Sequence, residues 1–423
     1  MTLYIKNANF VDWQALDFKS THIEVDQGID GSIRFLDALP DHISSAQVFD
    51  AKGKIVTKSF ACGHHHIYAT LARGMPAPAR TPTNFVEILK YVWWNLDKNL
   101  DLEMIRASAL AAALYCAKNG VTFIIDHHAS PFSLQDSLFT IKDAFDSVGV
   151  SHLLCYEISD RDGEGIRDKG LEETQNYLAA GNAGHVGLHA SFTVKDTLLE
   201  KAVSMADAFS TGIHIHVAED KADQEHCLKD YNKRVVKRLS EAGVLDMRKT
   251  ILGHCLHLDE DEKELLRNSS AWIAQNVESN LNNNVGLTDY SAYGEKVMLG
   301  TDGMHCDMLR SAKTAFFVGQ TTESISCSDA YKRFRNVHNY ISKNKFKGDG
   351  ENNLVILDYP SPTDIHSDNF LGHFIFGIDS CHVDSTIASG RFIVKEKQLV
   401  SADEQEILGV ARQMAGRLWK KLS

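Results

Sequence analysis

The strongest constraint on the fold is a regular alternation of short apolar runs with helical stretches through the middle of the chain. Strands that alternate with helices over about 290 residues favour an α/β fold, a parallel sheet closed as a (β/α)8 TIM barrel. A doubly wound sheet would need a glycine-rich GxGxxG turn near its start, and the sequence has none. Two of the helices are expected over residues 102–118 and 221–242. The strands are expected over residues 121–125, 150–156, 186–189, 213–217, 250–254, 272–275 and 297–300.

The two ends of the chain have a different pattern, with apolar residues that alternate partly with polar ones or form short runs bounded by glycines. A final helix is expected to begin after Ser401, with Glu404 completing a capping box, and to run to Trp419. Strands are expected over residues 3–8, 21–25, 353–357, 374–376 and 387–400.

Side chains of the metal-binding type stand at the ends of four apolar runs of the middle part. In a barrel enzyme these strand ends meet at one rim and carry the chemistry. Residues two apart on a strand point to the same side, so His64 and His66 face one point while His65 faces away. The side chains are His64 and His66 after the run 55–62, His216 and Glu219 at the run 213–217, His254 at the run 250–254, and Asp302 after the run 297–300.

Imidazoles with one carboxylate suit a single divalent cation, with Zn2+ the best fit and Fe2+ or Mn2+ as alternatives. A catalytic site keeps one position for water, whose pKa the ion lowers toward 7. Glu219, three residues past His216, is placed to accept a proton from that water and deliver it to a substrate. A single strand-end histidine is more often structural, and the Asp302 motif alone reads as a turn. Four such features at successive strand ends favour a metal site.

Composition narrows the class of protein further. The net charge of −12 argues against a nucleic-acid or anionic-membrane surface. No apolar run approaches the roughly 20 residues of a membrane-spanning helix. The eight cysteines are scattered without a CxxC pair, as expected for reduced thiols. We therefore expect a cytoplasmic enzyme with a small-molecule substrate and neither nucleic acid nor membrane as a partner.

The ordered strand-end motifs resemble those of the amidohydrolase superfamily. Within it, the chain is similar to the metal-dependent aminohydrolase branch, which holds guanine, cytosine and 8-oxoguanine deaminases and the atrazine and triazine hydrolases. The segments 126–131, 156–163 and 187–192 look most like the SsnA-type aminohydrolases. The shared motifs are the histidines at 64–66, HxHxxE at 214–219, HCxHL at 254–258, SN at 279–280 and LGTDG at 299–303.

The resemblance implies a role for each of the matching residues. Glu219 would be the proton shuttle, and His254 would polarise the attacking water or the substrate. Asp302 would also accept a proton from the water. The fourth strand, residues 186–191, lacks the bridging lysine of two-metal members, which favours a single metal. The implied metal ligands are His64, His66, His216 and Asp302.

Substrate contacts are less well defined by the resemblance. His189 matches a histidine of the branch that contacts substrate, so a binding role is expected for it. For His127 and His128, ring recognition and a structural role are equally open. Trp93 and Trp94 read as helix packing rather than as a pocket lid. Two departures stand out: Gln275 replaces a histidine of the seventh-strand pattern, and the segment 327–353 is atypical.

The resemblance also implies a domain plan and a reaction. Both chain ends would form one small β-sandwich (residues 1–57 and 351–423, the latter including the final helix) beside a barrel at 58–350, in a homodimer. The expected reaction is deamination of an amino-substituted nitrogen heterocycle, most simply a purine-like base, by a metal-bound hydroxide. The alternative is hydrolysis of another C–N or C–Cl bond, in a triazine or a cyclic amide. A catalytically silent barrel is disfavoured because every implied ligand and Glu219 are present.

Overall fold

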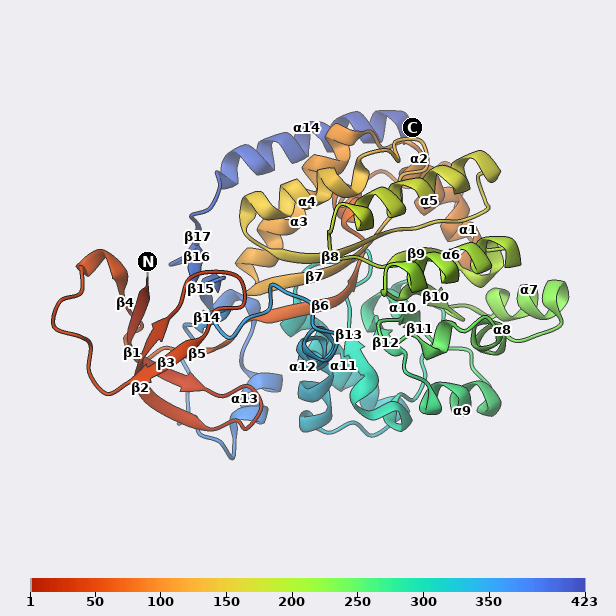
Figure 1. The fold of residues 1–423 in the computed structure, drawn as a ribbon. Coiled ribbons are helices and arrows are strands. Elements are labelled where there is room, and N and C mark those ends of the chain that lie inside the picture. The colour runs from red at the N-terminus through yellow and green to blue at the C-terminus, as the bar shows by residue number, and fades with distance from the viewer. Residues whose placement is uncertain (1, 423) are drawn as a thin grey trace.

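Parallel strands from the middle of the chain surround the centre of the computed structural model, which describes residues 2–422 (Figure 1). They pair as one sheet in the order β6-β7-β8 and a second in the order β13-β12-β11-β10-β9. Isolated parallel bridges link the two sheets at both edges. Leu154 pairs with Gly184 and Ile158 with Leu188 at one edge, and His65 pairs with Asp302 at the other. The strands are β6 (Phe60–His65), β7 (Val121–His128), β8 (Ser151–Tyr156), β9 (Val186–Ala190), β10 (Ile213–Val217), β11 (Ile251–His254), β12 (Trp272–Gln275) and β13 (Val297–Leu299).

Helices follow these strands, as the alternation in the sequence predicts. The expected helix at 102–118 is confirmed as α3 (Leu102–Lys118), whose N-terminus is capped by the Asp101 carboxylate accepting from the N–H of Met104. The prediction of a single helix over residues 221–242 is wrong. Asn232 adopts a left-handed φ of 53° and divides it into α7 (Lys221–Tyr231) and α8 (Val235–Glu241). The others are α1 (Phe85–Ile88), α2 (Trp94–Lys98), α4 (Ser137–Val148), α5 (Glu164–Ala179), α6 (Asp196–Ala208), α9 (Glu260–Asn268), α10 (Val277–Asn282), α11 (Met308–Thr322) and α12 (Cys327–Lys343).

Strands from both chain ends form one separate nine-stranded sheet, on the left of Figure 1. Its order is β17-β16-β15-β14-β5-β1-β2-β3, with β4 on β1. The two ends meet where β5 pairs with β14. The apolar run 55–62 is therefore two strands in two sheets, because the chain passes from β5 to β6 at Ser59. The strands are β1 (Leu3–Val11), β2 (Phe18–Val25), β3 (Ile33–Leu36), β4 (Val48–Asp50), β5 (Ile55–Lys58), β14 (Leu354–Leu357), β15 (Val383–Ala388), β16 (Arg391–Lys395) and β17 (Gln398–Leu399).

Three expectations for the second half of this region are wrong. The run expected over residues 387–400 is divided among the end of β15, β16 and β17, because left-handed turns at residues 389–390 and 396–397 interrupt it. Residues 374–376 lie in the helix α13 (Phe370–Phe376), where Phe370 and Phe374, four residues apart, both pack on Tyr331. The final helix α14 (Glu404–Leu422) is capped by Asp403, which accepts from the N–H groups of residues 405 and 406, and not by Ser401. Within residues 2–422, no helix has the length and apolar character needed to cross a bilayer.

A buried group of charges, here named the junction cluster, joins β5 to the atypical segment 327–353. It consists of Lys58, Arg335, His338 and Asp349. The Asp349 carboxylate lies 2.7 Å from Lys58 Nζ and 2.7 Å from His338 Nδ1. Arg335 donates to the carbonyl oxygens of Lys58 (3.1 Å) and Ser59 (2.8 Å). Burial raises the pKa of Asp349, but His338 and Lys58 outweigh it and lower the pKa to about 2. The cluster fixes the chain at its passage from the nine-stranded sheet into β6.

Candidate metal centre and active site

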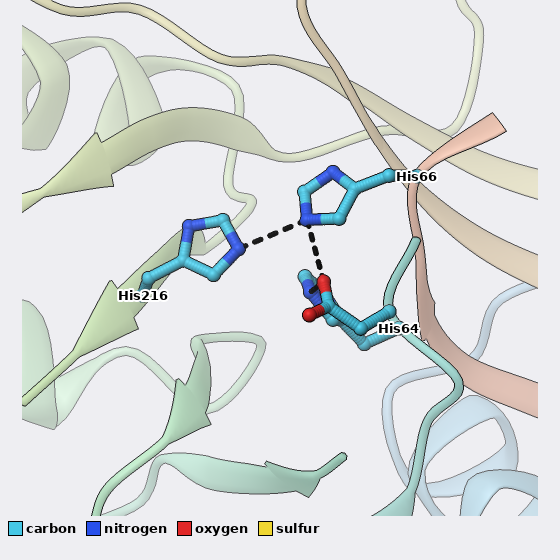
Figure 2. Close-up of side chains that lie close together, drawn as sticks. His64, His66 and His216 are labelled. Atoms are coloured by element: carbon cyan, nitrogen blue, oxygen red, sulfur yellow. Dashed lines mark hydrogen bonds and ion pairs between the residues drawn. The ribbon is translucent and has the colours of Figure 1, made fainter. Parts of the chain in front are cut away.

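Four buried side chains converge at the C-terminal ends of β6, β10 and β13. They are His64, His66, His216 and Asp302, here named the rim cluster, and one ligand atom of each lies within 4.8 Å of the others. The Nε2 atoms of His66 and His216 are 3.1 Å apart, and an Asp302 oxygen lies 2.8 Å from His66 Nε2 and 3.3 Å from His64 Nε2. Figure 2 shows the rings of His66 and His216 turned toward each other, with His64 beside them.

The other nitrogen of each ring fixes its orientation. The Nδ1–H of His66 donates to the carbonyl oxygen of His127 (2.6 Å), and that of His216 donates to the carbonyl oxygen of His189 (2.9 Å). His64 Nδ1 is hydrogen-bonded to His214 Nε2 (2.8 Å). With the Nδ1 atoms engaged in this way, the Nε2 atoms of His66 and His216 face each other. Carbonyl partners of this kind orient metal-binding histidines.

The donor set of the rim cluster fits a divalent cation. Three Nε2 atoms and a carboxylate oxygen meet, and His64 Nε2 is buried without a hydrogen-bond partner within residues 2–422. Burial lowers the pKa of His66, but the Asp302 carboxylate outweighs it and raises the pKa to about 9. The cluster therefore attracts positive charge to the point where these atoms meet, as a site of three imidazoles and one carboxylate does for zinc.

A carboxylate and a fourth imidazole stand beside the rim cluster. Glu219 Oε2 lies 3.6 Å from His254 Nε2, which in turn lies 4.0 Å from an Asp302 oxygen. Burial raises the pKa of Glu219 to about 7, and Asp302 adds to that shift. A carboxyl group that titrates near neutral pH is suited to accept and return a proton. His254 Nε2 is buried and has no hydrogen-bond partner within residues 2–422.

The serine and asparagine of the seventh-strand motif hold two of these groups in place. The Ser279 hydroxyl donates to an Asp302 oxygen, and the side-chain oxygen of Asn280 accepts from the Nδ1–H of His254 (2.7 Å). Both residues lie on α10, directly after β12. Asn283, one turn further, donates to Glu219 Oε1 (3.3 Å).

The backbone is strained where these strands end. Ala218, His254, Cys255 and Asp302 have positive φ angles of 46°, 67°, 55° and 51°, in the left-handed region that non-glycine residues rarely adopt. Such strain concentrates at functional sites, where the surrounding structure enforces it. Here it turns His254 and Asp302 from their strands toward the common centre.

A cavity of ≈ 590 Å³, counting its open mouth, leads to the rim cluster. His66, His216, Glu219 and Asp302 form part of its wall, and so does His189. Aromatic and apolar side chains narrow the cavity, namely Tyr68, Phe85, Leu89, Trp93, Trp94 and Met304.

Only one of the three histidines considered as substrate contacts lines the cavity. His189 lines the cavity, whereas His127 and His128 are fully buried behind it. His127 Nε2 lies 3.1 Å and 3.2 Å from two backbone carbonyl oxygens, and His128 Nε2 is hydrogen-bonded to Ser130. These hydrogen bonds are the ones expected if His127 and His128 have a structural role rather than a role in recognising the substrate ring. Trp93 and Trp94 line the cavity as well as packing on the hydrophobic core.

The sequence analysis missed Glu157 as a cavity residue. It follows β8, and its side chain is only 3% exposed yet lines the cavity. The available signal was an acidic residue at the end of the third barrel strand, the same position that carries the site residues on the other strands.

Sequence comparison places this arrangement in a family. The amidohydrolase family profile matches residues 55–333, so the chain belongs to the amidohydrolase family. It is a hydrolase that acts on carbon–nitrogen bonds.

Similar proteins are found at low identity over most of the chain. A 5-methylthioadenosine/S-adenosylhomocysteine deaminase of Syntrophomonas wolfei is 25% identical, covering 88% of both chains. A 5'-deoxyadenosine deaminase of Methanopyrus kandleri is 27% identical, covering 84% of both. Among solved structures, a zinc-bound adenosine deaminase from Xanthomonas campestris superposes with a TM-score of 0.83 at 17% identity, covering 98% of both. This likeness shows that the fold is of the TIM-barrel type.

Proposed function

We propose that this hydrolase deaminates an amino-substituted nitrogen heterocycle, a purine or a related base, in a metal-dependent reaction. The observation that carries the proposal is the position of Glu219. Its carboxyl group, with a pKa raised to about 7 by burial, faces the same cavity as the rim cluster. The names of the two relatives, both deaminases of adenosine derivatives, support the same reaction.

The rim cluster would hold one divalent metal, with Zn2+ as the best fit to three imidazoles and a carboxylate. The ion, when bound, lowers the pKa of a water molecule and so supplies the nucleophile. The zinc in the structural neighbour from Xanthomonas campestris supports that choice of metal.

Two side chains of the protein transfer the two protons of the water molecule. The water oxygen forms a bond to the ring carbon that carries the amino group. Glu219 takes one proton and passes it to the adjacent ring nitrogen, while Asp302 takes the other and passes it to the amino group, which leaves as ammonia. His254, fixed by Asn280 through its Nδ1–H, presents Nε2 to the oxygen that becomes the product carbonyl.

Several expectations from the sequence form part of the proposal. We propose that the eight parallel strands, whose two sheets are joined by isolated bridges at both edges, close as one barrel spanning residues 58–350. A small β-sandwich of residues 1–57 and 351–423, the latter including the final helix, stays the prediction for the domain beside it. The homodimeric state and the cytoplasmic location stay predictions.

Ammonia release from a panel of amino-purines, amino-pyrimidines and amino-triazines tests the proposal, with metal-replete enzyme and Asp302→Asn as the blank. We expect ammonia from at least one purine or related base, and none from the blank. Chloride or alkylamine release without ammonia would replace deamination by the triazine-type reaction. Silence across the panel with metal bound would overturn the proposal.

A further inference from the structure

The carboxyl group of Glu219 is held by one side chain of the protein. Asn283 donates from Nδ2 to Glu219 Oε1 (3.3 Å), and no other hydrogen bond to this carboxyl group is found within residues 2–422. The second oxygen, Oε2, lies 3.6 Å from His254 Nε2. Asn283 and Glu219 both line the cavity. The two oxygens of Glu219 therefore differ in their surroundings: Oε1 is bound to α10, and Oε2 stands beside His254.

The orientation of the Asn283 amide follows from its remaining contacts. Its Oδ1 accepts from the Nδ2 of Asn282 (3.1 Å), and its own Nδ2 also donates to the hydroxyl oxygen of Ser279 (3.4 Å). The backbone N–H of Asn283 donates to the carbonyl oxygen of Ser279 (2.8 Å) and closes the last turn of α10. The two amide hydrogens thus have two acceptors, a carboxyl oxygen and a hydroxyl oxygen, and the oxygen of the amide has a donor. Both the backbone and the side chain of Asn283 are fixed.

Asn283 also connects the two carboxylates to which the proposed reaction assigns proton transfer. The Ser279 oxygen that accepts from Asn283 donates its hydrogen to Asp302 Oδ2. A continuous chain of hydrogen bonds therefore runs from Glu219 through Asn283 and Ser279 to Asp302. Because both linking residues belong to one turn at the end of α10, this turn sets how the two carboxylates stand relative to each other.

The direction of the Asn283 hydrogen bond assigns the two oxygens of Glu219 different tasks. An amide N–H only donates, so Oε1 is an acceptor whether the carboxyl group is ionised or protonated. We propose that Asn283 is a positioning residue that reserves Oε1 as an acceptor, so that Oε2 is the oxygen that takes the proton and returns it. An Oε2–H bond forms as an O–H bond of the water breaks, and it breaks again as the N–H bond of the ring forms. This inference rests on the proposed deaminase function and describes how Glu219 works in it.

Asn283→Leu tests the proposal by removing both donors with little change in side-chain volume. With the best substrate of the panel we expect kcat to fall about 10–100-fold, as for the loss of a hydrogen bond to a charged group. KM should stay close to wild type, because Asn283 acts on the proton transfer and not on substrate binding. A higher KM with an unchanged kcat would make Asn283 a substrate contact and overturn the proposal.

A double-mutant cycle with Glu219→Gln shows whether Asn283 acts through Glu219. In the Glu219→Gln background, Asn283→Leu should change kcat by less than about twofold, because residues that act as a unit are not additive. The full loss of kcat in both backgrounds would contradict the proposal. Asn339→Leu is the matched control, since this asparagine also donates to a neighbouring side chain (Asn336, 3.0 Å) but lies outside the cavity wall. It should leave kcat and KM unchanged.

An infrared measurement tests the same contact without turnover. At acidic pH, the C=O stretch of protonated Glu219 is the band that distinguishes the spectrum of the wild type from that of Glu219→Gln. Since Oε1 is the carbonyl oxygen that accepts from Asn283, we expect this band to move to higher wavenumber in Asn283→Leu. An unchanged band would overturn the proposal. A shifted band in an enzyme that releases ammonia from no compound of the panel would uphold the assignment of Oε1 and Oε2 while the deaminase function fails.

Discussion

The rim cluster and the junction cluster are two buried groups of charged and polar side chains at opposite ends of β6, and they differ in how the charges are arranged. In the junction cluster, hydrogen-bond donors face a carboxylate: Asp349 lies between Lys58 Nζ and His338 Nδ1. In the rim cluster, ring nitrogens of the same kind face one another, as between His66 and His216. Buried groups that complement one another hold the fold, whereas groups that do not complement one another need a ligand.

The largest effect is expected from Glu219→Gln beside the rim cluster, which should lower activity strongly and leave stability nearly unchanged. Loss of a proton-transferring carboxylate lowers kcat by about 10²–10⁴-fold. The free energy of unfolding should stay within about 0.5 kcal/mol, because the amide keeps the shape of the side chain. Steady-state kinetics and urea denaturation check both. A variant that retains full turnover would remove Glu219 from the mechanism.

At the junction cluster we expect a substitution to lower stability and to leave activity nearly unchanged. Asp349→Asn leaves Lys58 buried without its counter-charge, which should lower the free energy of unfolding by about 3–5 kcal/mol. The kcat of the protein that remains folded should be close to wild type, because the cluster does not line the cavity. Denaturation curves and kinetics at low temperature measure the two quantities. A large loss of kcat in folded protein would contradict the division between the clusters.

A residue that supports the rim without facing the substrate should give a smaller effect. Ser279→Ala removes the hydroxyl that donates to Asp302. Loss of such a partner weakens metal affinity or activity by about 10–100-fold. Metal titration with a competing chelator measures it, and Ser311→Ala, a buried serine of α11, is the control. Unchanged metal affinity in Ser279→Ala would mean that this contact does not position Asp302.

The smallest effect is expected on stability when the pH is lowered. The pKa of Asp349 is lowered to about 2, so its carboxylate contributes stability that is fully present above about pH 4 and is lost as the pH falls through about 2. The contribution is about 2 kcal/mol at neutral pH. The stability difference between wild type and Asp349→Asn should therefore shrink between pH 4 and pH 2. A difference that is constant over this range would show that the charge of Asp349 is not what stabilises the junction.

The sequence predicted the central strands well because each is a short apolar run with a polar end. The ranges 213–217 and 272–275 match β10 and β12 residue for residue. Breaks within apparently continuous segments were missed, because they depend on single backbone angles, such as φ at Asn232, or on a change of sheet, as at Ser59.

The site was also predicted in part: the residues of the rim cluster were foreseen, and the positions of others relative to the cavity were not. The strand-end spacing predicted that polar side chains of several strands would meet at one rim, because strand direction fixes where such side chains point. The family resemblance then singled out His64, His66, His216 and Asp302, which the structure brings together. The positions of His127, His128 and Glu157 relative to the cavity depend on irregular pairing between β6 and β7 and on packing behind the strands. Such features are properties of three-dimensional contacts and leave no spacing in the sequence.

The pairing of β5 with β14 has a consequence for protein synthesis. Lys58 faces Leu354 across this ladder, so almost 300 residues must leave the ribosome between the two partners. At about 5–20 residues per second, β5 waits roughly 15–60 s for its neighbour. During that interval the edge of β5 that β14 will cover is open to other chains. Pairing of β1 with the opposite edge of β5 leaves this edge open, so a newly made chain is exposed to mispairing there until translation is almost complete.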